Sequence, residues 1–254
     1  MAQDFQGKVV VITGAGAGIG QAAALAFSRK GAKVVVNSRS QTSTMSTVNA
    51  LLSEGGDAYP VWGDVSQEGV PEAILRAAVE HYGRIDILVN NAGIVVPGTI
   101  DTLSVADLDR SYATNVRSIF QLTQGAIPYL RKNPGGVIVN IASIAGLKGT
   151  KNRLAYSATK GALISMSRSL ALELAPEQIR VNCICPGMTK SPSLAQRISA
   201  MPDPDAAEAG FVAAVPMGRL GQPEDIAEAI VFAASDACPF LTGAVITVDG
   251  GKSL

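Results

Sequence analysis

Cysteine and histidine are scarce in this chain, and their scarcity excludes several kinds of scaffold and site. Three cysteines are too few for a disulfide framework in 254 residues. Cys183 and Cys185 stand two apart in an apolar stretch, where an extended strand would hold them too far apart to bridge. Reduced thiols in a cytoplasmic protein are the simplest account. His81 is the only histidine, so a histidine triad or multi-histidine metal site is hard to build; we expect no metal and a surface position for His81.

Excess charge of one sign and long apolar runs are also missing. Lys+Arg and Asp+Glu balance at 21 each, which argues against a nucleic-acid partner and against a polybasic membrane patch. No apolar run reaches the roughly 18 residues that a membrane helix needs. The first six residues, 1–6, show no basic segment followed by an apolar stretch, so we expect no signal peptide. With 47% hydrophobic and 17% charged residues, the chain should be globular, with well-covered strands and no membrane partner.

Apolar, β-branched runs alternate with helical patterns along the whole chain. The strand-like runs are Lys8–Thr13, Lys33–Asn37, Tyr59–Trp62, Ile85–Asn90, Gly136–Ser143, Arg180–Cys185 and Ala244–Val248. The helical patterns are Ile19–Lys30, Thr42–Glu54, Val70–Tyr82, Ser104–Leu130, Tyr156–Leu174 and Pro223–Ser235. This alternation implies right-handed βαβ crossovers. We therefore predict an α/β fold, a doubly wound, Rossmann-type parallel sheet of seven strands with helices on both faces, formed by residues 1–254 as a single domain.

Residues 188–218 interrupt the alternation with four prolines and only short helical patterns. The segment follows a predicted strand, and ligands bind at the carboxyl ends of the strands in such sheets. We expect a substrate lid here, with Phe211, Val212 and Met217 as apolar side chains that dock it. The alternative is a disordered excursion.

A predicted strand that ends in a serine precedes a helix that begins with a tyrosine. Ser143 closes the run from Gly136, and Tyr156 and Lys160 stand four apart in the next helical pattern. Residues four apart share one face of a helix, so both side chains should point at one spot, which Ser143 can reach from the sheet. A phenol needs a nearby cation to lower its pKa from about 10 toward neutrality. We predict that Ser143, Tyr156 and Lys160 are catalytic; an ordinary surface pair is the alternative.

A glycine-rich loop joins the first predicted strand to the first predicted helix. This order lets backbone N–H groups meet a pyrophosphate at a helix N-terminus, and glycines permit the close approach. We expect a dinucleotide to bind there. The expected contacts from this loop are Gly14, Ala17, Gly18, Ile19 and Gly20.

The end of the second predicted strand selects between the two nicotinamide cofactors. An acidic residue there would bind the 2′-hydroxyl of NAD, but this chain has Ser38 followed by Arg39. A guanidinium can pair with the 2′-phosphate, and no carboxylate is present to repel it. We therefore favour NADP(H), with NAD(H) as the alternative, because Ala17 is not the basic residue that would add a second phosphate contact.

With these pieces placed, the chain resembles the short-chain dehydrogenase/reductase family over essentially its whole length. The resemblance is carried by Thr13-Gly14-x-x-x-Gly18-x-Gly20, Asp64-Val65, Asn90-Asn91-Ala92-Gly93, Asn115 within Ala113-Thr-Asn-Val, Ser143, Tyr156 and Lys160, Pro186-Gly187, Arg219–Asp225 and Thr247–Gly251. It implies further cofactor contacts by Asp64, Val65, Asn91, Ala92, Gly93, Tyr156, Lys160, Pro186, Gly187 and Thr189. Family members often carry a threonine where this chain has Ser191, so the hydroxyl that holds the carboxamide is Thr189 or Ser191.

The resemblance also implies a mechanism and an assembly. Tyr156 would be the general acid for ketone reduction or the base for alcohol oxidation, Lys160 would lower its pKa and hold the nicotinamide ribose, and Ser143 would orient the substrate oxygen. Asn115 would be a fourth catalytic residue that kinks its helix and ties a water into a proton relay. Family members are usually tetramers, so a homotetramer is expected, with the Ser104–Leu130 and Tyr156–Leu174 helices and the segment 240–246 as interfaces.

Three functions remain open from the sequence. The leading hypothesis is an NADP(H)-dependent oxidoreductase that interconverts a small-molecule ketone and a secondary alcohol by hydride transfer. Apolar residues beside the predicted site favour an alicyclic, aromatic or steroid-like substrate; they are Ile144, Leu147, Leu154, Met188 and Leu194. A 3-oxoacyl-carrier-protein reductase is the second hypothesis and needs a basic patch, for which Arg117, Lys148, Lys151 and Arg153 are available. A catalytically silent dinucleotide-binding regulator is the third.

Overall fold

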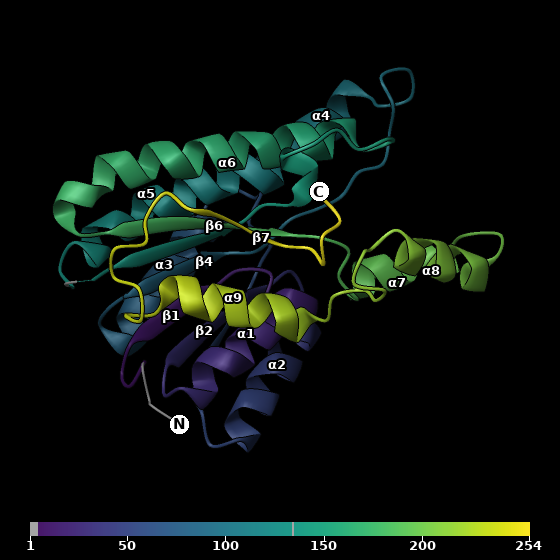
Figure 1. The fold of residues 1–254 in the computed structure, drawn as a ribbon. Helices are drawn as coiled ribbons and strands as arrows, with labels where there is room; N and C mark the ends of the chain where they lie inside the picture. The colour runs from purple at the N-terminus through teal and green to yellow at the C-terminus, as the bar shows by residue number, and fades with distance from the viewer. Residues whose placement is uncertain (1–4, 134) are drawn as a thin grey trace.

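Seven parallel strands form one sheet in the computed structural model, which describes residues 5–133 and 135–254 (Figure 1). The strand order across the sheet is β3-β2-β1-β4-β5-β6-β7, which confirms the doubly wound α/β prediction. The strands are β1 (Val9–Ile12), β2 (Lys33–Ser38), β3 (Asp57–Trp62), β4 (Ile87–Asn90), β5 (Val137–Ile141), β6 (Arg180–Pro186) and β7 (Val245–Val248). The expectation of no signal peptide rests partly on residues 1–4, which lie outside the described residues.

Helices cover both faces of the sheet because successive strand residues point to opposite sides. Val10 and Ile12 of β1 pack with one set of helices, which contains α1 (Gly18–Arg29), α2 (Gln41–Ser53) and α9 (Pro223–Ala234). Val9 and Val11 pack with the other set, which contains α3 (Val70–Tyr82), α5 (Ser118–Leu130) and α6 (Leu154–Leu174). The inner strands are therefore buried on both faces, as their continuous apolar runs predict, whereas the edge strands β3 and β7 are partly exposed. No helix in the described ranges combines the length and apolar character needed to cross a bilayer.

The helix predicted over Ser104–Leu130 is interrupted in its middle. It divides into α4 (Val105–Tyr112), a π-helical turn over Ala113–Arg117, and α5. A π turn adds a residue to the helical repeat and is common at functional sites. This turn carries Asn115, so the kink expected at that residue has a specific geometry.

Residues 188–218 fold into two short helices rather than a disordered excursion. These are α7 (Pro192–Ser199) and α8 (Pro204–Ala213), which project beyond the carboxyl ends of the strands (Figure 1). Their own small apolar cluster is formed by Met188, Leu194, Ile198, Phe211, Val212, Val215 and Leu220. Met217 was expected to help dock this segment, but 69% of it is exposed, so that expectation was wrong. We call residues 188–218 the lid.

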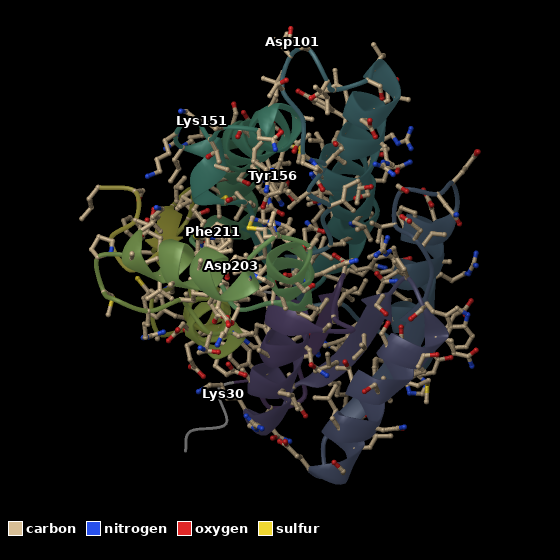
Figure 2. All side chains as sticks on the ribbon, turned by 90° about the vertical axis from the view of Figure 1, so that its right-hand side faces the viewer. Lys30, Asp101, Lys151, Tyr156, Asp203 and Phe211 are labelled. Carbon is tan, nitrogen blue, oxygen red and sulfur yellow. The ribbon has the colours of Figure 1, made fainter. Side chains whose placement is uncertain are left out.

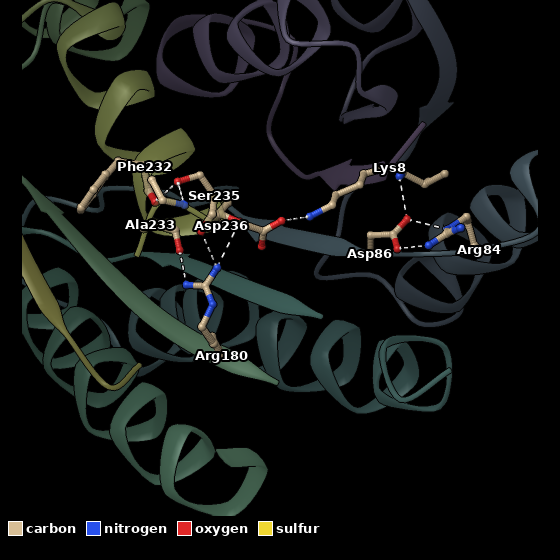
Figure 3. A network of polar contacts seen from close by, with 11 residues as sticks. Lys8, Arg84, Asp86, Arg180, Phe232, Ala233, Ser235 and Asp236 are labelled. Carbon is tan, nitrogen blue, oxygen red and sulfur yellow. Dashed lines mark hydrogen bonds and ion pairs between the residues drawn. The ribbon is translucent and has the colours of Figure 1, made fainter. Parts of the chain in front are cut away.

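A polar network lies at the amino ends of the strands, away from the end where the lid projects (Figure 3). Asp86, just before β4, accepts hydrogen bonds from the Val9 backbone N–H at 2.9 Å and from the Arg84 guanidinium at 2.6 and 2.8 Å. Arg180, the first residue of β6, donates to four backbone carbonyls at the end of α9 and just beyond it. The acceptors are the carbonyl oxygens of Ala233, Ala234, Ser235 and Leu241. These contacts stabilise the end of the sheet that lies away from the predicted chemistry.

Candidate active site

A cleft of about 540 Å³ opens at the carboxyl ends of the central strands. Nine of the predicted cofactor contacts line it: Gly14, Ala17, Ser38, Arg39, Asp64, Val65, Asn91, Ala92 and Gly93. Seven further lining residues were not predicted individually: Gly16, Asn37, Ser40, Ser43, Gly63, Ile94 and Thr114. Each of the seven is within two residues of a predicted contact or of Asn115, except Ser43, which lies in the first turn of α2. The cleft thus brings the glycine loop and the ends of β2 and β4 together.

The glycine loop is locked against the end of β4. Thr13 Oγ accepts hydrogen bonds from the backbone N–H groups of Asn91 at 3.2 Å and Ala92 at 3.1 Å. In return, the Asn91 amide donates to the carbonyls of Thr13 and Gly14, both at 3.0 Å. Gly14 has φ +64°, and a Cβ there would lie 2.8 Å from the Ala92 Cα. Only glycine permits this approach, so the loop holds a fixed shape before any ligand arrives.

Hydroxyl groups surround Arg39 at the end of β2. Ser38 Oγ lies 2.7 Å from the hydroxyls of both Ser43 and Thr44, and Ser40 Oγ accepts the Ser43 N–H as the N-cap of α2. Arg39 itself is exposed, and within residues 5–133 and 135–254 no carboxylate pairs with it. A free guanidinium, hydroxyls and a helix N-terminus are groups that bind a phosphate.

Ser143, Tyr156 and Lys160 meet where β5 and α6 face each other. Ser143 ends the strand and begins a short 3₁₀ turn, with its Oγ accepting the Ala145 N–H at 3.1 Å. The Ser143 hydroxyl lies close enough to the Tyr156 phenol to lower the pKa of that phenol, against the larger effect of burial. Lys160 Nζ lies 5.8 Å from the centroid of the Tyr156 ring and donates to the Ile141 carbonyl at 2.7 Å. The phenol, the hydroxyl and the ammonium therefore converge as the spacing predicts.

The surroundings of Tyr156 and Lys160 shift their pKa values in ways that the sequence analysis did not predict. Burial raises the pKa of Tyr156, opposed by the hydroxyl of Ser143 and by the charges of Arg197 and Arg153. Burial also lowers the pKa of Lys160 from 10.5 to about 8. Lys160 therefore holds its proton less strongly than an exposed lysine does, and a nearby charge can shift its pKa further.

Asn115 lies beside Lys160 and joins two segments of the site. Its Oδ1 accepts the Ile94 N–H at 2.8 Å, and its Nδ2 donates to the Ile94 carbonyl at 3.0 Å and to Thr159 Oγ at 3.1 Å. Gly93 completes the junction, because a Cβ there would lie 3.3 Å from Asn115 Oδ1 and 3.4 Å from Lys160 Nζ. The inner end of the cleft therefore adjoins the Ser143–Tyr156–Lys160 group. The side chain of Asn115 is fully used by protein contacts, so a water relay would need its backbone carbonyl.

The remaining predicted contacts stand at the end of β6 and on α1. Gly187 is packed against Asp249, whose Cβ would lie 2.6 Å from an added Cβ, and Pro186 ends the strand. Thr189 is buried and donates to the Gly187 carbonyl at 3.4 Å, whereas the Ser191 hydroxyl caps α7. Six of these predicted contacts lie outside the lining of the cleft: Pro186, Gly187, Thr189, Gly18, Ile19 and Gly20. Gly18 instead lines a neighbouring hollow of about 530 Å³ together with Ser191 and Pro192 of the lid.

Two features of the site were missed or misread from the sequence. Arg197 of α7 lies close enough to Tyr156 and Arg153 for their charges to shift its pKa, and no motif marks it. Leu194 was expected in the substrate wall but is buried inside the lid, because α7 turns that face toward Ile198 and Leu220. A lid residue's direction depends on how the lid folds, which local patterns do not fix.

Comparisons with known proteins agree with this geometry. A family model described as enoyl-(acyl carrier protein) reductase matches residues 14–253. An uncharacterized oxidoreductase of Thermotoga maritima is 46% identical over 98% of this chain and 99% of that protein. The 3-oxoacyl-[acyl-carrier-protein] reductase of the same organism is 36% identical over 97% and 98% of the two chains. A crystal structure of levodione reductase superposes with a TM-score of 0.94 at 30% identity, covering 98% of each chain.

These similarities extend over the whole fold and include the segments that form the cleft and the Ser143–Tyr156–Lys160 group. The relatives are dehydrogenases and reductases, and the fold with its glycine loop is that of a nicotinamide-dinucleotide enzyme. This chain is accordingly an NAD(P)-dependent oxidoreductase, and it belongs to the short-chain dehydrogenase/reductase family.

Proposed function

We propose that this enzyme interconverts a ketone and a secondary alcohol with NADP(H). The observation that carries the proposal is the convergence of Ser143, Tyr156 and Lys160 beside Gly93, at the inner end of the cleft. A phenol and a hydroxyl that face the same spot can together hold a carbonyl or carbinol oxygen. Their position next to the cleft would put that oxygen within reach of the reactive end of a dinucleotide.

The residues of the cleft fit a dinucleotide. Side chains are absent where the pyrophosphate would approach: a Cβ at Gly14 or Gly16 would lie 2.8 or 2.6 Å from existing atoms. When bound, the nicotinamide ring supplies or accepts the hydride. Asn91, Ala92 and Gly93 would hold its inner half, and Lys160 would hold the ribose hydroxyls.

The chain's own contribution is to place the substrate oxygen and to move one proton. In reduction, Ser143 and Tyr156 donate hydrogen bonds to the carbonyl oxygen, which polarises the carbonyl carbon for hydride attack. Tyr156 then transfers its proton to that oxygen, giving the alcohol and a phenolate. In oxidation, the phenolate takes the hydroxyl proton as the hydride leaves the carbon. The Lys160 ammonium stabilises the phenolate in both directions, and Asn115 keeps the segment at Ile94 in place beside it.

The surroundings of Arg39 favour NADP(H). The 2′-phosphate of NADP would meet an unpaired guanidinium, the hydroxyls of Ser40 and Ser43, and the N-terminus of α2. The carboxylate in this cleft, Asp64, accepts hydrogen bonds from the Ser66 N–H at 2.9 Å and its hydroxyl at 2.7 Å. It is therefore held in its own turn and suits an adenine contact rather than the ribose.

The substrate is proposed to be a small molecule with a cyclic or aromatic body. Leu147 follows Ser143 by four residues and Leu154 precedes Tyr156 by two, and they are 44% and 45% exposed, which leaves apolar surface free for a ligand. The similarity to levodione reductase supports a reductase of this kind.

A 3-oxoacyl-carrier-protein reductase is the second candidate. It is favoured by the 36% identity to the Thermotoga maritima enzyme and by the exposed loop 148–153, which carries Lys148, Lys151 and Arg153. The other proposed contributor, Arg117, donates to the Ser66 carbonyl at 2.9 Å on the far side of the cleft, so the basic patch is limited to that loop.

Assembly and location are also proposals. Exposed apolar side chains on α5 and α6 include Phe120 and Leu172, and Phe240 before β7 is fully exposed, which suits the two interfaces of a homotetramer. Cys183, Cys185 and Cys238 are all free thiols, in keeping with the reducing cytoplasm.

The test is a carbonyl panel assayed with NADPH and with NADH at 340 nm. The panel spans small diketones, bulky cyclic and aromatic ketones, sugars and acetoacetyl thioesters. NADPH-linked reduction of cyclic or aromatic ketones is expected; turnover of acetoacetyl thioesters alone would favour the second candidate. Tyr156→Phe should lower kcat by about 10²- to 10⁴-fold and leave cofactor affinity unchanged. A variant that keeps its activity would remove the proposed general acid.

A further inference from the structure

Two arginines flank the proposed general acid, and the mechanism above uses neither. Arg153 is the N-cap residue of α6, three residues before Tyr156, and Arg197 comes from α7 of the lid. Figure 2 views the molecule from the lid side and places Tyr156 in the centre of that face, above Phe211 of α8. One arginine therefore comes from the body of the fold and the other from the lid.

The Nε–H group of Arg197 is buried, and in the described part of the chain it has no hydrogen-bond acceptor. Buried N–H donors are nearly always paired in folded proteins, so an unpaired one needs an explanation. At a binding site, the simplest explanation is an acceptor supplied by the ligand.

Arg153 has little local compensation for its charge. One N–H of its guanidinium donates to the carbonyl of the preceding residue, Asn152, at 2.6 Å. Across residues 5–133 and 135–254, no carboxylate forms an ion pair with Arg153 or Arg197. Besides burial, the charge of Arg153 lowers the pKa of Arg197, and the charges of both arginines act to lower the pKa of Tyr156 against the burial that raises it. Two like charges at such range repel each other, and an anion bound between them would remove that repulsion.

We propose that Arg153 and Arg197 form an anion-binding subsite, so that the substrate is a ketone or alcohol that also carries a carboxylate, sulfonate or phosphate group. A guanidinium presents a planar fork of donors that matches such groups, often with two hydrogen bonds at once. The inference rests on the proposed function and narrows its substrate class. The carbonyl meets Ser143 and Tyr156, the apolar body contacts Leu147 and Leu154, and the anion lies between the arginines.

This subsite would also couple substrate binding to the lid. Arg197 belongs to α7, which packs within the lid through Leu194 and Ile198, whereas Arg153 belongs to the rigid edge of α6. An anion shared by both guanidiniums therefore bridges the lid to the body of the enzyme. A neutral ketone of the same shape lacks this bridge and should bind with lower affinity.

The experiment compares matched ketones that differ only in charge. Reduction of 5-oxohexanoate, of the corresponding keto sulfonate and keto phosphate, and of methyl 5-oxohexanoate is measured in the wild type, Arg197→Gln and Arg153→Gln. Lys151→Gln is the control, because it removes one positive charge from the same segment, and Lys151 is exposed. Circular dichroism and thermal unfolding verify that each variant is folded.

The subsite predicts a charge preference that depends on the two arginines. At least one anionic ketone should have kcat/KM about 10- to 100-fold above the ester in the wild type and in Lys151→Gln. That ratio should fall to near 1 in Arg197→Gln and decrease in Arg153→Gln, mainly through KM. Which anion is preferred identifies the ligand chemistry. Equal rates for ester and anions, or a preference that survives both arginine substitutions, would overturn the proposal.

A binding measurement separates this proposal from the proposed reaction. Hexanoate, hexanesulfonate and hexyl phosphate are titrated calorimetrically into Tyr156→Phe, with and without added Arg197→Gln, in the presence of NADPH. Binding that is lost with Arg197 supports the subsite even when no ketone in the panel is reduced, in which case only the proposed reaction fails. No binding of any of the three anions would overturn the subsite, whatever ketones the wild type reduces.

Discussion

Lys160 is a charged side chain that the fold buries, with only 3% of it exposed. Burial lowers its pKa from 10.5 to about 8, so between these values the unfolded chain binds a proton that the folded chain does not. Stability must then rise with pH across that window, by roughly 3 kcal/mol for this group alone. Below about pH 8 the lysine is charged in both states and its cost is fully present.

Lys160→Met should remove this dependence. Urea unfolding of the wild type and the variant, without cofactor and at one protein concentration, is measured from pH 7 to pH 10.5. The difference in unfolding free energy between the two proteins should shift in favour of the wild type as the pH rises. A difference that stays constant across the range would show that Lys160 keeps an ordinary pKa in the fold.

Arg39 tests the proposed cofactor preference. Arg39→Asp should shift the ratio of kcat/KM for NADPH over that for NADH toward NADH by about 10- to 100-fold, because a carboxylate replaces the guanidinium beside the 2′-phosphate. The exposed Arg76→Asp on α3 is a matched control with the same charge change. An unchanged ratio would place the phosphate contact elsewhere, with the hydroxyls of Ser40 and Ser43 as the next residues to vary.

Sequence reasoning succeeds at residues whose roles are set by local spacing. Tyr156 and Lys160 converge because four residues make about one helical turn, and Ser143 meets them because it ends the adjacent strand. Arg197 was not predicted, because its reach toward Tyr156 depends on how the lid folds. The raised pKa of Tyr156 was also not foreseen, because burial and distant charges decide it rather than spacing.

At the scale of elements, most strands and helices were predicted to within a few residues. The helix over Ser104–Leu130 is the clearest difference, because apolar periodicity runs through the π turn at Ala113–Arg117 without a break. One extra residue in a turn leaves little trace in a hydrophobic pattern. The lid helices were missed for another reason: α7 and α8 are short, begin with prolines, and bury their apolar residues mainly against each other.

The end of α9 depends on a single side chain from β6. Arg180 is buried and donates to the carbonyls of Ala233, Ala234 and Ser235, which a helix otherwise leaves without partners at its C-terminal end, and to the Leu241 carbonyl beyond the helix (Figure 3). Arg180→Met should lower the unfolding free energy by about 2 to 4 kcal/mol, because those carbonyls lose charged donors inside the protein. The effect is measured by urea denaturation, and kcat of the folded variant should be close to that of the wild type.

Substituting a surface arginine tests whether burial causes the loss of stability in Arg180→Met. Arg131 makes two hydrogen bonds to Glu177, but both partners are at the surface. Exposed ion pairs contribute little to stability, so Arg131→Met should unfold at nearly the wild-type urea concentration. Equal losses in the two variants would mean that the buried contacts at α9 are no more important than a surface pair.

Across the whole molecule, the contacts that stabilise the sheet and the residues of the candidate site lie at opposite ends of the strands. Asp86 and Arg180 stabilise the amino ends of the strands, whereas the cleft and the Ser143–Tyr156–Lys160 group lie at the carboxyl ends. This arrangement was predictable, because the alternation of strands and helices fixes a parallel sheet, and loops at its carboxyl edge are free to carry function. The polar contacts at the amino ends of the strands were not predictable, since they depend on pairings between residues as distant in sequence as Arg180 and Ala233.

Assembly is the largest feature that exposed residues suggest. Leu172 on α6 is 79% exposed and Phe240 is 100% exposed, at two separate surfaces that match the expected interfaces of a tetramer. Light scattering should give about four times the chain mass of 26.1 kDa for the wild type. A charge buried in an apolar interface is unfavourable, so Leu172→Asp and Phe240→Asp should each yield smaller species. Leu52→Asp on α2, 50% exposed, is the control and should remain a tetramer. If all three variants have the wild-type mass, neither surface is an interface, and the exposed side chains need another partner.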